Sequence, residues 1–111
     1  MVEYRGSPLD AIYAALSHPV RRAVLEHLRE VDATVTELAV PFAMSLAAVS
    51  KHIRVLEGAG LLERSVHGRE HHIALNPSPL HSAARWLDSY QAFWEERLDL
   101  LEAKLKGRHR R

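Results

Sequence analysis

The chain of 111 residues contains no cysteine. This absence excludes disulfide bonds, cysteine nucleophiles, thiolate metal ligands and thiol redox chemistry. Aromatic residues make up only 6% of the chain. No apolar run approaches the roughly 18 residues that a membrane-spanning helix requires, and the N-terminus lacks the pattern of a secretory signal peptide. We therefore expect a cytoplasmic protein without membrane contacts.

Sequence motifs of catalysis are also missing. The chain has no glycine-rich phosphate loop and no His-Glu-x-x-His sequence. Glu70, His71 and His72 offer an acid and two bases, but neighbours along a strand point to opposite faces, so the three are not expected to converge. We predict that the protein is not an enzyme and uses no cofactor.

The net charge is small, and the charges are unevenly distributed. Fifteen basic and 14 acidic residues give +1. Acidic residues are in excess over residues 1–44, whereas residues 45–72 have one extra basic residue and four of the eight histidines. The basic excess of residues 73–111 lies in the last eight positions. Such a chain would bind a polyanion through a few well-placed cations.

Residues 45–58 predict a short amphipathic helix. Ser45 is a good N-cap, and Gly58 and Gly60 mark the C-terminal end. The apolar residues recur at spacings of three, four and three, which predicts one buried stripe: Leu46, Val49, Ile53 and Leu56. The opposite face carries small, polar and cationic residues, which allow close approach to base edges and phosphates: Ala47, Ala48, Ser50, Lys51 and Arg54.

Residues 61–75 predict a two-stranded hairpin, or wing, directly after that helix. Its tip is Val66–Arg69, where Gly68 is free to adopt a positive φ. Arg69 at the tip is placed to meet a phosphate or the minor groove. A helix followed at once by a basic hairpin indicates a winged helix-turn-helix that binds nucleic acid.

The remaining segments predict four more helices. All the predicted elements belong to one domain, residues 1–111. A helix over 7–17 is capped by Ser7, and a second helix spans 19–30. A short third helix, capped by Thr36 and ending near residues 42–43, begins the helix-turn-helix of residues 36–58. A long helix over 79–106 precedes a solvated basic tail, 107–111. The fold class is mainly α with a small β-hairpin and about five helices.

The long helix has apolar residues at alternating spacings of four and three: Leu80, Ala84, Leu87, Gln91, Trp94, Leu98, Leu101 and Leu105. This repeat of 3.5 residues is the seam of a helix pair. About 27 residues extend roughly 40 Å, which is longer than one small domain covers. We hypothesise that the seam pairs with a second copy, assisted by Leu9, Ile12 and Tyr13. The alternative is that the seam packs only within the monomer.

Residues 44–75 read MSLAAVSKHIRVLEGAGLLERSVHGREHHIAL and resemble the helix-turn-helix and wing of the ArsR-type (ArsR/SmtB) family of bacterial transcriptional regulators. The upstream segments LSHPVRRAVLEHL and VTELA resemble the helices that precede them in that family. The resemblance covers roughly residues 9–100. It implies a homodimer that acts mostly as a repressor at its own or adjacent promoters.

We predict that double-stranded DNA is contacted from the helix by Ser45, Ala47, Ala48, Ser50, Lys51, His52 and Arg54, and from the wing by Arg64, His67 and Arg69. The alternative for Lys51 and Arg54 is a solvated helix face. His52 either contacts DNA or packs against the turn, and Arg64 either contacts DNA or pairs with Glu57 or Glu63. A two-fold dimer reads an inverted repeat, with half-sites one helical turn or a multiple apart.

An effector is not identified by the sequence. Relatives often sense metals or metalloids through cysteines in the helix before the reading helix, and residues 37–42 contain no thiol. A zinc or nickel site on the long helix would need more imidazoles than His81 at suitable spacing, so no metal site is predicted. The histidines of the wing either raise DNA affinity at low pH, bind metal adventitiously, or are simply exposed.

Another function class stays open beside DNA binding. A winged helix can serve only as a protein-protein assembly module, without sequence-specific DNA binding. That function predicts an apolar or acidic face on the helix of residues 45–58. Ser50, Lys51 and Arg54 argue against it.

Overall fold

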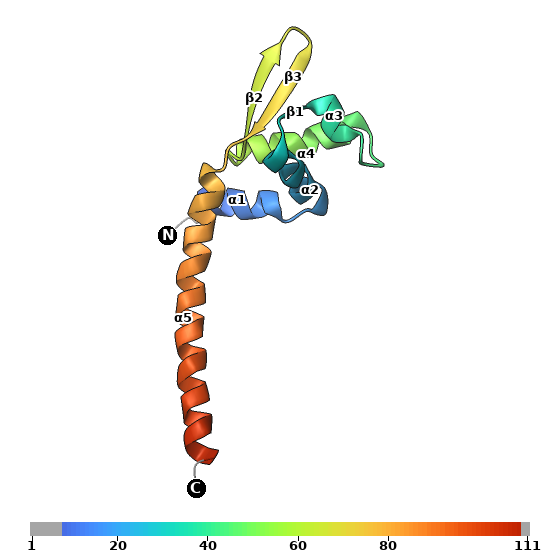
Figure 1. The fold of residues 1–111 in the computed structure, drawn as a ribbon. Coiled ribbons are helices and arrows are strands. Elements are labelled where there is room, and N and C mark those ends of the chain that lie inside the picture. Colours follow the sequence, from blue (N-terminus) through green and yellow to red (C-terminus); the bar gives the residue numbers. More distant parts are fainter. Residues whose placement is uncertain (1–7, 110–111) are drawn as a thin grey trace, which may run out of the picture.

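The computed structural model describes residues 8–109, with side chains through residue 107 (Figure 1). Five helices and three strands make up this part of the chain. The elements are α1 Pro8–Leu16, α2 Pro19–Glu30, β1 Ala33–Thr34, α3 Val35–Ala39, α4 Leu46–Gly58, β2 Leu62–His67, β3 Glu70–Leu75 and α5 Ser78–His109. The predicted cap Ser7 and the last two residues of the predicted tail lie outside the described residues.

One hydrophobic core holds α2, α3, α4 and the sheet together. Its fully buried large side chains come from all four of these parts: Val24, Leu38, Val49, Ile53, Leu56, Leu61 and Ile73. Complete burial of a side chain of this size contributes about 1.5–3 kcal/mol, before the entropy cost of ordering it. Because α4 supplies three of these residues on one stripe, the core fixes which face of α4 is turned outward.

Helix α3 begins two residues earlier than the sequence suggested, and the prediction of Thr36 as its cap was wrong. The Oγ1 of Thr34 accepts from the backbone N–H of Glu37 at 3.2 Å, and the Glu37 carboxylate accepts from the backbone N–H of Thr34 at 3.3 Å. The Thr34 hydroxyl also donates to the Glu37 carboxylate at 2.9 Å, and this bond, together with the one from the Thr34 backbone N–H, lowers the pKa of Glu37. The pattern is a capping box, which requires Thr and Glu three residues apart.

The connection between α3 and α4 is correspondingly longer than expected. Helix α3 ends at Ala39, so residues 40–45 join it to α4 rather than two or three residues. Pro41 lies in this connection and not inside the helix, where its missing N–H would break a hydrogen bond.

The wing is the antiparallel hairpin of β2 and β3, which pairs from Leu62↔Leu75 to His67↔Glu70. The two-residue turn at its tip begins with Gly68, whose φ of 65° suits glycine. The sequence predicted two strands, but the short β1 adds a third to the base of the wing in the order β1-β3-β2. A strand of two residues is too short to show a period of two.

Helix α5 runs from Ser78 to His109, beyond both ends of the predicted span 79–106. Residues 107–109, expected in the tail, are therefore helical. The first turns of α5 pack on α1, where the Tyr13 hydroxyl donates to the Ala83 carbonyl at 3.3 Å and the Tyr13 ring meets Trp86 edge-on. The rest of α5 extends away from the other elements (Figure 1). None of the described helices is long and apolar enough to span a membrane.

Candidate nucleic-acid interface

The outward face of α4 is set by what the opposite face buries. Val49, Ile53 and Leu56 are completely buried, so Lys51 and Arg54 point to solvent. Ser45 caps the helix, since its Oγ accepts from the backbone N–H of Ala48 at 3.1 Å. Among the other small residues on this face, Ala47 is exposed, and Ala48 and Ser50 are half-buried.

Two shallow hollows meet along this face. The first, about 600 Å³, is lined by Leu46, Ala47, Ala48, Ser50, Lys51 and Arg54. The second, about 610 Å³, lies between α4, the start of α3 and the wing, and its lining includes Arg64, Arg69 and residues 34–37. Leu46, Ser50 and Arg54 line both hollows. They recur every four residues, so they form a ridge on the helix between the hollows.

Leu46 does not belong to the buried stripe in which its spacing placed it. Its exposed fraction is 50%, whereas Val49, three residues later, has none of its surface exposed. The spacing rule assumes that neighbouring elements cover the whole stripe, and half of the Leu46 surface is left uncovered. Sequence reasoning therefore missed Leu46 as a residue of this surface.

His52 faces the start of α2 and not the outward surface. Its ring lies 4.3 Å from the ring of His18, and its Nδ1 lies 3.3 Å from a guanidinium nitrogen of Arg21. Burial lowers the pKa of His52, and the charges of His18 and Arg21 lower it further. The ring therefore packs against the start of α2 rather than against the turn, and DNA contact by His52 stays a prediction.

Arg64 is held in an ion pair within the chain. Its guanidinium donates to both carboxylate oxygens of Glu57, at 2.5 and 3.1 Å, and a third nitrogen lies 2.9 Å from Nδ1 of His71. The hydrogen bond that Arg64 donates to Glu57 raises the pKa of Arg64. Both partners are about one quarter exposed, so this pair anchors the base of the wing to α4 and leaves little of Arg64 for DNA.

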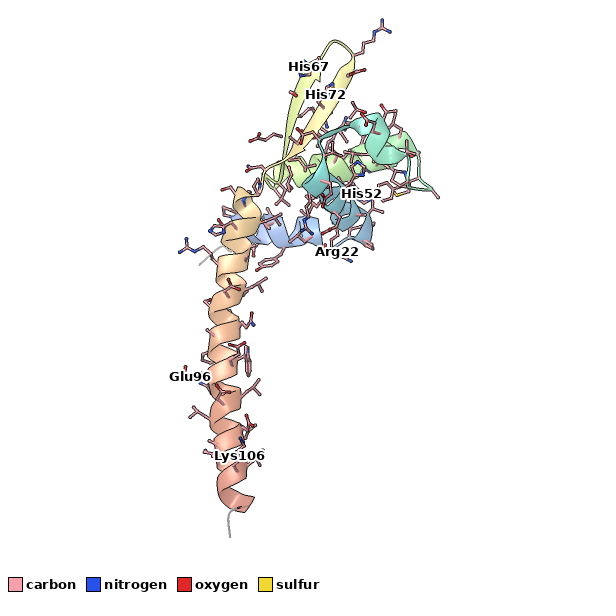
Figure 2. All side chains as sticks on the ribbon, in the orientation of Figure 1. Arg22, His52, His67, His72, Glu96 and Lys106 are labelled. Atoms are coloured by element: carbon pink, nitrogen blue, oxygen red, sulfur yellow. The ribbon has the colours of Figure 1, made fainter. Side chains whose placement is uncertain are left out.

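The outer part of the wing presents Arg69 at its exposed tip and His67 beside it. The rings of His67 and His72 meet edge-on with centroids 4.9 Å apart (Figure 2). His72 Nε2 also lies 3.0 Å from a carboxylate oxygen of Glu70, so two members of the sequence trio meet while the three together do not converge. Residues two apart on a strand share a face, whereas His71 points elsewhere and meets Arg64.

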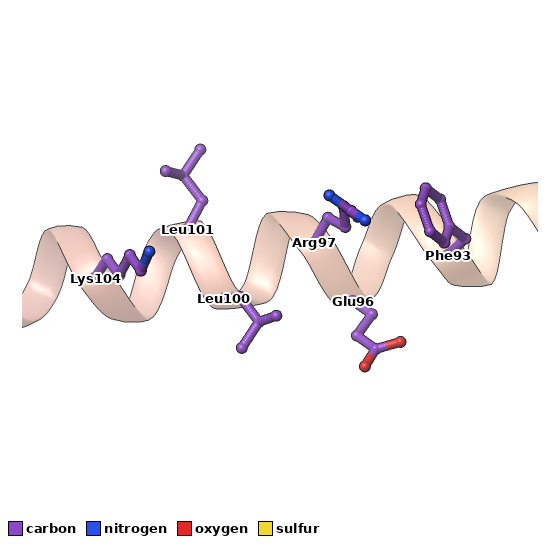
Figure 3. Close-up of a pocket in the computed structure, with 6 residues that line it drawn as sticks. All are labelled: Phe93, Glu96, Arg97, Leu100, Leu101 and Lys104. Carbon is purple, nitrogen blue, oxygen red and sulfur yellow. The ribbon is translucent and has the colours of Figure 1, made fainter.

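The predicted dimer residues fall into two groups. Ile12 is buried within its own chain, and Leu9, Tyr13 and Leu80 are half-buried there. The others remain exposed along α5: Ala84, Leu87, Gln91, Trp94, Leu98 and Leu101. Figure 3 shows Phe93, Arg97 and Leu101 on one side of the helix, with the Arg97 guanidinium 4.6 Å from the Phe93 ring centroid.

The described residues contain no cluster of three His, Asp or Glu side chains with the geometry to hold a metal ion. The wing histidines are engaged with Glu70, Arg64 and one another instead. Together, α4 and the wing form a polar and cationic surface that is accessible to a large ligand in solution.

Residues 16–65 match the family model described as a helix-turn-helix domain. The transcriptional repressor SdpR of Bacillus subtilis is 27% identical over 79 residues, which cover 71% of this chain and 88% of that protein. A crystal structure of an ArsR family transcriptional regulator is 40% identical, with a TM-score of 0.76, and covers 80% of this chain and 98% of that one.

The fold is also shared with a homodimeric winged helix-turn-helix DNA-binding domain from Mycobacterium bovis, at 22% identity and a TM-score of 0.59 over 83% of this chain and 82% of that one. The sequence resemblance, the fold and the outward face of α4 therefore agree. The chain belongs to the ArsR family of transcriptional regulators.

Proposed function

We propose that the protein is a homodimeric repressor that binds an inverted repeat in double-stranded DNA through α4 and the wing. The observation that carries the proposal is the cationic face of α4, which the buried stripe turns outward next to Arg69 of the wing. Repression is supported by the likeness to SdpR, which is a transcriptional repressor. We also infer that the protein acts in the cytoplasm, because its proposed ligand is DNA, and no catalytic step is part of the proposal.

The dimer is supported by α5. Large apolar side chains such as Trp94 and Leu98 are 57% and 60% exposed there, and exposed apolar stretches of this kind indicate a protein interface. The neighbour from Mycobacterium bovis is homodimeric. A second copy of α5 offers the same seam of 3.5-residue period, so the two seams are self-complementary.

Two copies related by a two-fold axis present two α4 helices to the same duplex. Reading helices of this kind enter successive major grooves on one side of the DNA, so the half-sites are about one helical turn, or a multiple of it, apart. Ser50, Lys51 and Arg54 then contact base edges and phosphates. Arg69 reaches backbone phosphate or the minor groove next to each half-site.

The test is binding to the DNA upstream of the protein's own gene, measured by gel shift and fluorescence anisotropy at fixed salt. Lys51→Ala and Arg54→Ala are each expected to weaken binding by about 1–3 kcal/mol. Lys106→Ala is the matched control, because Lys106 is an exposed cation on α5, remote from α4. It should bind like the wild type.

DNA affinities are compared only for variants whose circular dichroism spectrum and sedimentation coefficient equal those of the wild type, so that folding and assembly are unchanged. If Lys51→Ala and Arg54→Ala both bind like the wild type, the reading face is wrongly assigned. If the wild type binds no duplex better than unrelated DNA, the protein does not act as a sequence-specific regulator at that site, and an assembly function takes its place.

A further inference from the structure

An exposed leucine at the start of the reading helix is unexplained by the fold. Leu46 is the first residue of α4, and half of its surface is exposed. The cap of the helix is supplied by Ser45, and the core contacts of α4 by Val49, Ile53 and Leu56. Leu46 therefore contributes neither to the cap of α4 nor to the core.

The position of Leu46 relates it to the proposed DNA surface. It lines both hollows together with Ser50 and Arg54, and stands at the end of the ridge where the helix begins. In helix-turn-helix proteins the N-terminal residues of the reading helix approach the base edges most closely. Among those edges, the C5-methyl of thymine is the apolar group that a leucine side chain can cover in the major groove.

We propose that Leu46 determines specificity by covering a thymine methyl group in each half-site of the operator. This inference rests on the proposed DNA-binding function. A protein partner for the same patch is disfavoured, because the first hollow is also lined by Lys51, and lysine is depleted in the cores of protein interfaces. A duplex matches both properties, since its phosphates attract the cations while its thymine methyls fit the leucine.

The ridge also sets a distance within the half-site. Leu46 and Arg54 are eight residues apart on one helix, which corresponds to about 12 Å along its axis. Successive base pairs are about 3.4 Å apart, so the two residues reach bases about three to four pairs from one another if α4 follows the groove. Arginine pairs best with guanine, and therefore a thymine is expected at about that distance from a guanine.

The experiment is a double-mutant cycle between the protein and the DNA. An operator is selected from random duplexes with the wild-type protein, and its thymines are replaced by deoxyuridine, one symmetric pair at a time. Deoxyuridine removes only the methyl group. At one position per half-site, we expect removal to weaken wild-type binding about fourfold per half-site, the effect of burying one methyl group.

Leu46→Ala is expected to bind the thymine and deoxyuridine operators equally, whereas Leu46→Met, which keeps an apolar side chain, retains the preference for thymine. Val55→Ala is the matched control, because Val55 is a 41% exposed apolar residue of α4 that lines neither hollow. Its preference for thymine should equal that of the wild type.

Two results overturn the proposal: wild-type affinity that is unchanged at every deoxyuridine position, or a Leu46→Ala variant that keeps the preference. In both, the wild type still binds its selected operator, so the proposed DNA-binding function stands. If the selection yields no preferred duplex, the proposed function fails, and the role of Leu46 fails with it.

Discussion

A core of apolar side chains is buried in the domain formed by α1–α4 and the wing, whereas apolar side chains are exposed along α5 beyond its first turns. In the winged domain, Ile53 and Leu56 are completely buried, whereas Leu98 and Leu101 on α5 are more than half exposed. Both segments are amphipathic helices with a regular apolar stripe. The difference is that α4 has neighbours in its own chain on its apolar side and α5, beyond its first turns, has none among the described residues.

This contrast teaches that burial in the monomer separates two kinds of apolar stripe. The stripe of α4 stabilises the fold, whereas that of α5 is available to a partner. Hydrophobic burial in the dimer would make up for the modest core of a chain of this length. Substitutions on each stripe therefore test whether the two stripes behave differently.

The largest effect is expected in the core. Leu56→Ala should lower the free energy of unfolding by about 2–5 kcal/mol, because it removes a completely buried side chain and leaves a cavity. Leu46→Ala, on the same helix but half exposed, should change it by less than about 0.5 kcal/mol. Urea unfolding at one protein concentration measures both. Equal losses would mean that Leu46 is buried in solution.

The next effect concerns association. Leu98→Asp should weaken dimerisation by about 2 kcal/mol or more, roughly 30-fold, because a carboxylate replaces an apolar contact on the seam of each copy. Leu100→Asp is the matched control, since Leu98 and Leu100 are 60% and 61% exposed but only Leu98 lies on the seam. Sedimentation equilibrium measures both dissociation constants. A monomeric wild type at micromolar concentration contradicts the dimer.

A smaller effect distinguishes the two threonines near α3. Thr34→Ala should cost about 0.5–2 kcal/mol of stability, because it removes the cap that accepts from Glu37. Thr36→Ala should be nearly neutral, since Thr36 is exposed within the first turn of the helix. The same urea experiment decides. If Thr36→Ala lowers the free energy of unfolding more than Thr34→Ala does, Thr36 is the N-cap, as the sequence suggested.

The smallest effect is a pH dependence carried by His52. Its pKa is lowered in the folded protein by burial and by His18 and Arg21, so the unfolded chain binds a proton at higher pH than the folded chain does. Stability is therefore complete above the ordinary histidine pKa of about 6.5 and is lost as the pH falls toward the lowered value. His52→Gln should flatten this dependence in urea midpoints measured from pH 7.5 to about 5. A slope unchanged by the substitution contradicts this assignment.

Much of the fold was predictable because its signals are local. The capping serine, the stripe of Val49, Ile53 and Leu56, and the glycine of the wing tip each depend on residues within one turn or one hairpin. The exposure of Leu46, by contrast, depends on which neighbours the rest of the chain brings to the start of α4. The third strand was hidden because two residues show no periodicity, and it forms only by pairing with β3.

The candidate site was predictable in kind and less so in membership. Lys51, Arg54 and Arg69 lie on the outward surface as their positions in the motif suggested. His52 and Arg64 have the same chemistry but are occupied by His18 and Glu57. No spacing rule connects residues 18 and 52, because contacts over such a separation arise only when α2 packs on α4.

The sequence by itself determined the helix of residues 46–58, the wing, the absence of thiol chemistry and the resemblance to the ArsR family. Each of these follows from composition or from interactions between residues near one another in the chain. Only the tertiary structure decided which side of each helix is covered, and hence that Leu46 is exposed, that His52 is turned inward and that Arg64 is paired. The reason is physical: burial depends on neighbours that the chain brings in from far away, and local patterns do not specify them.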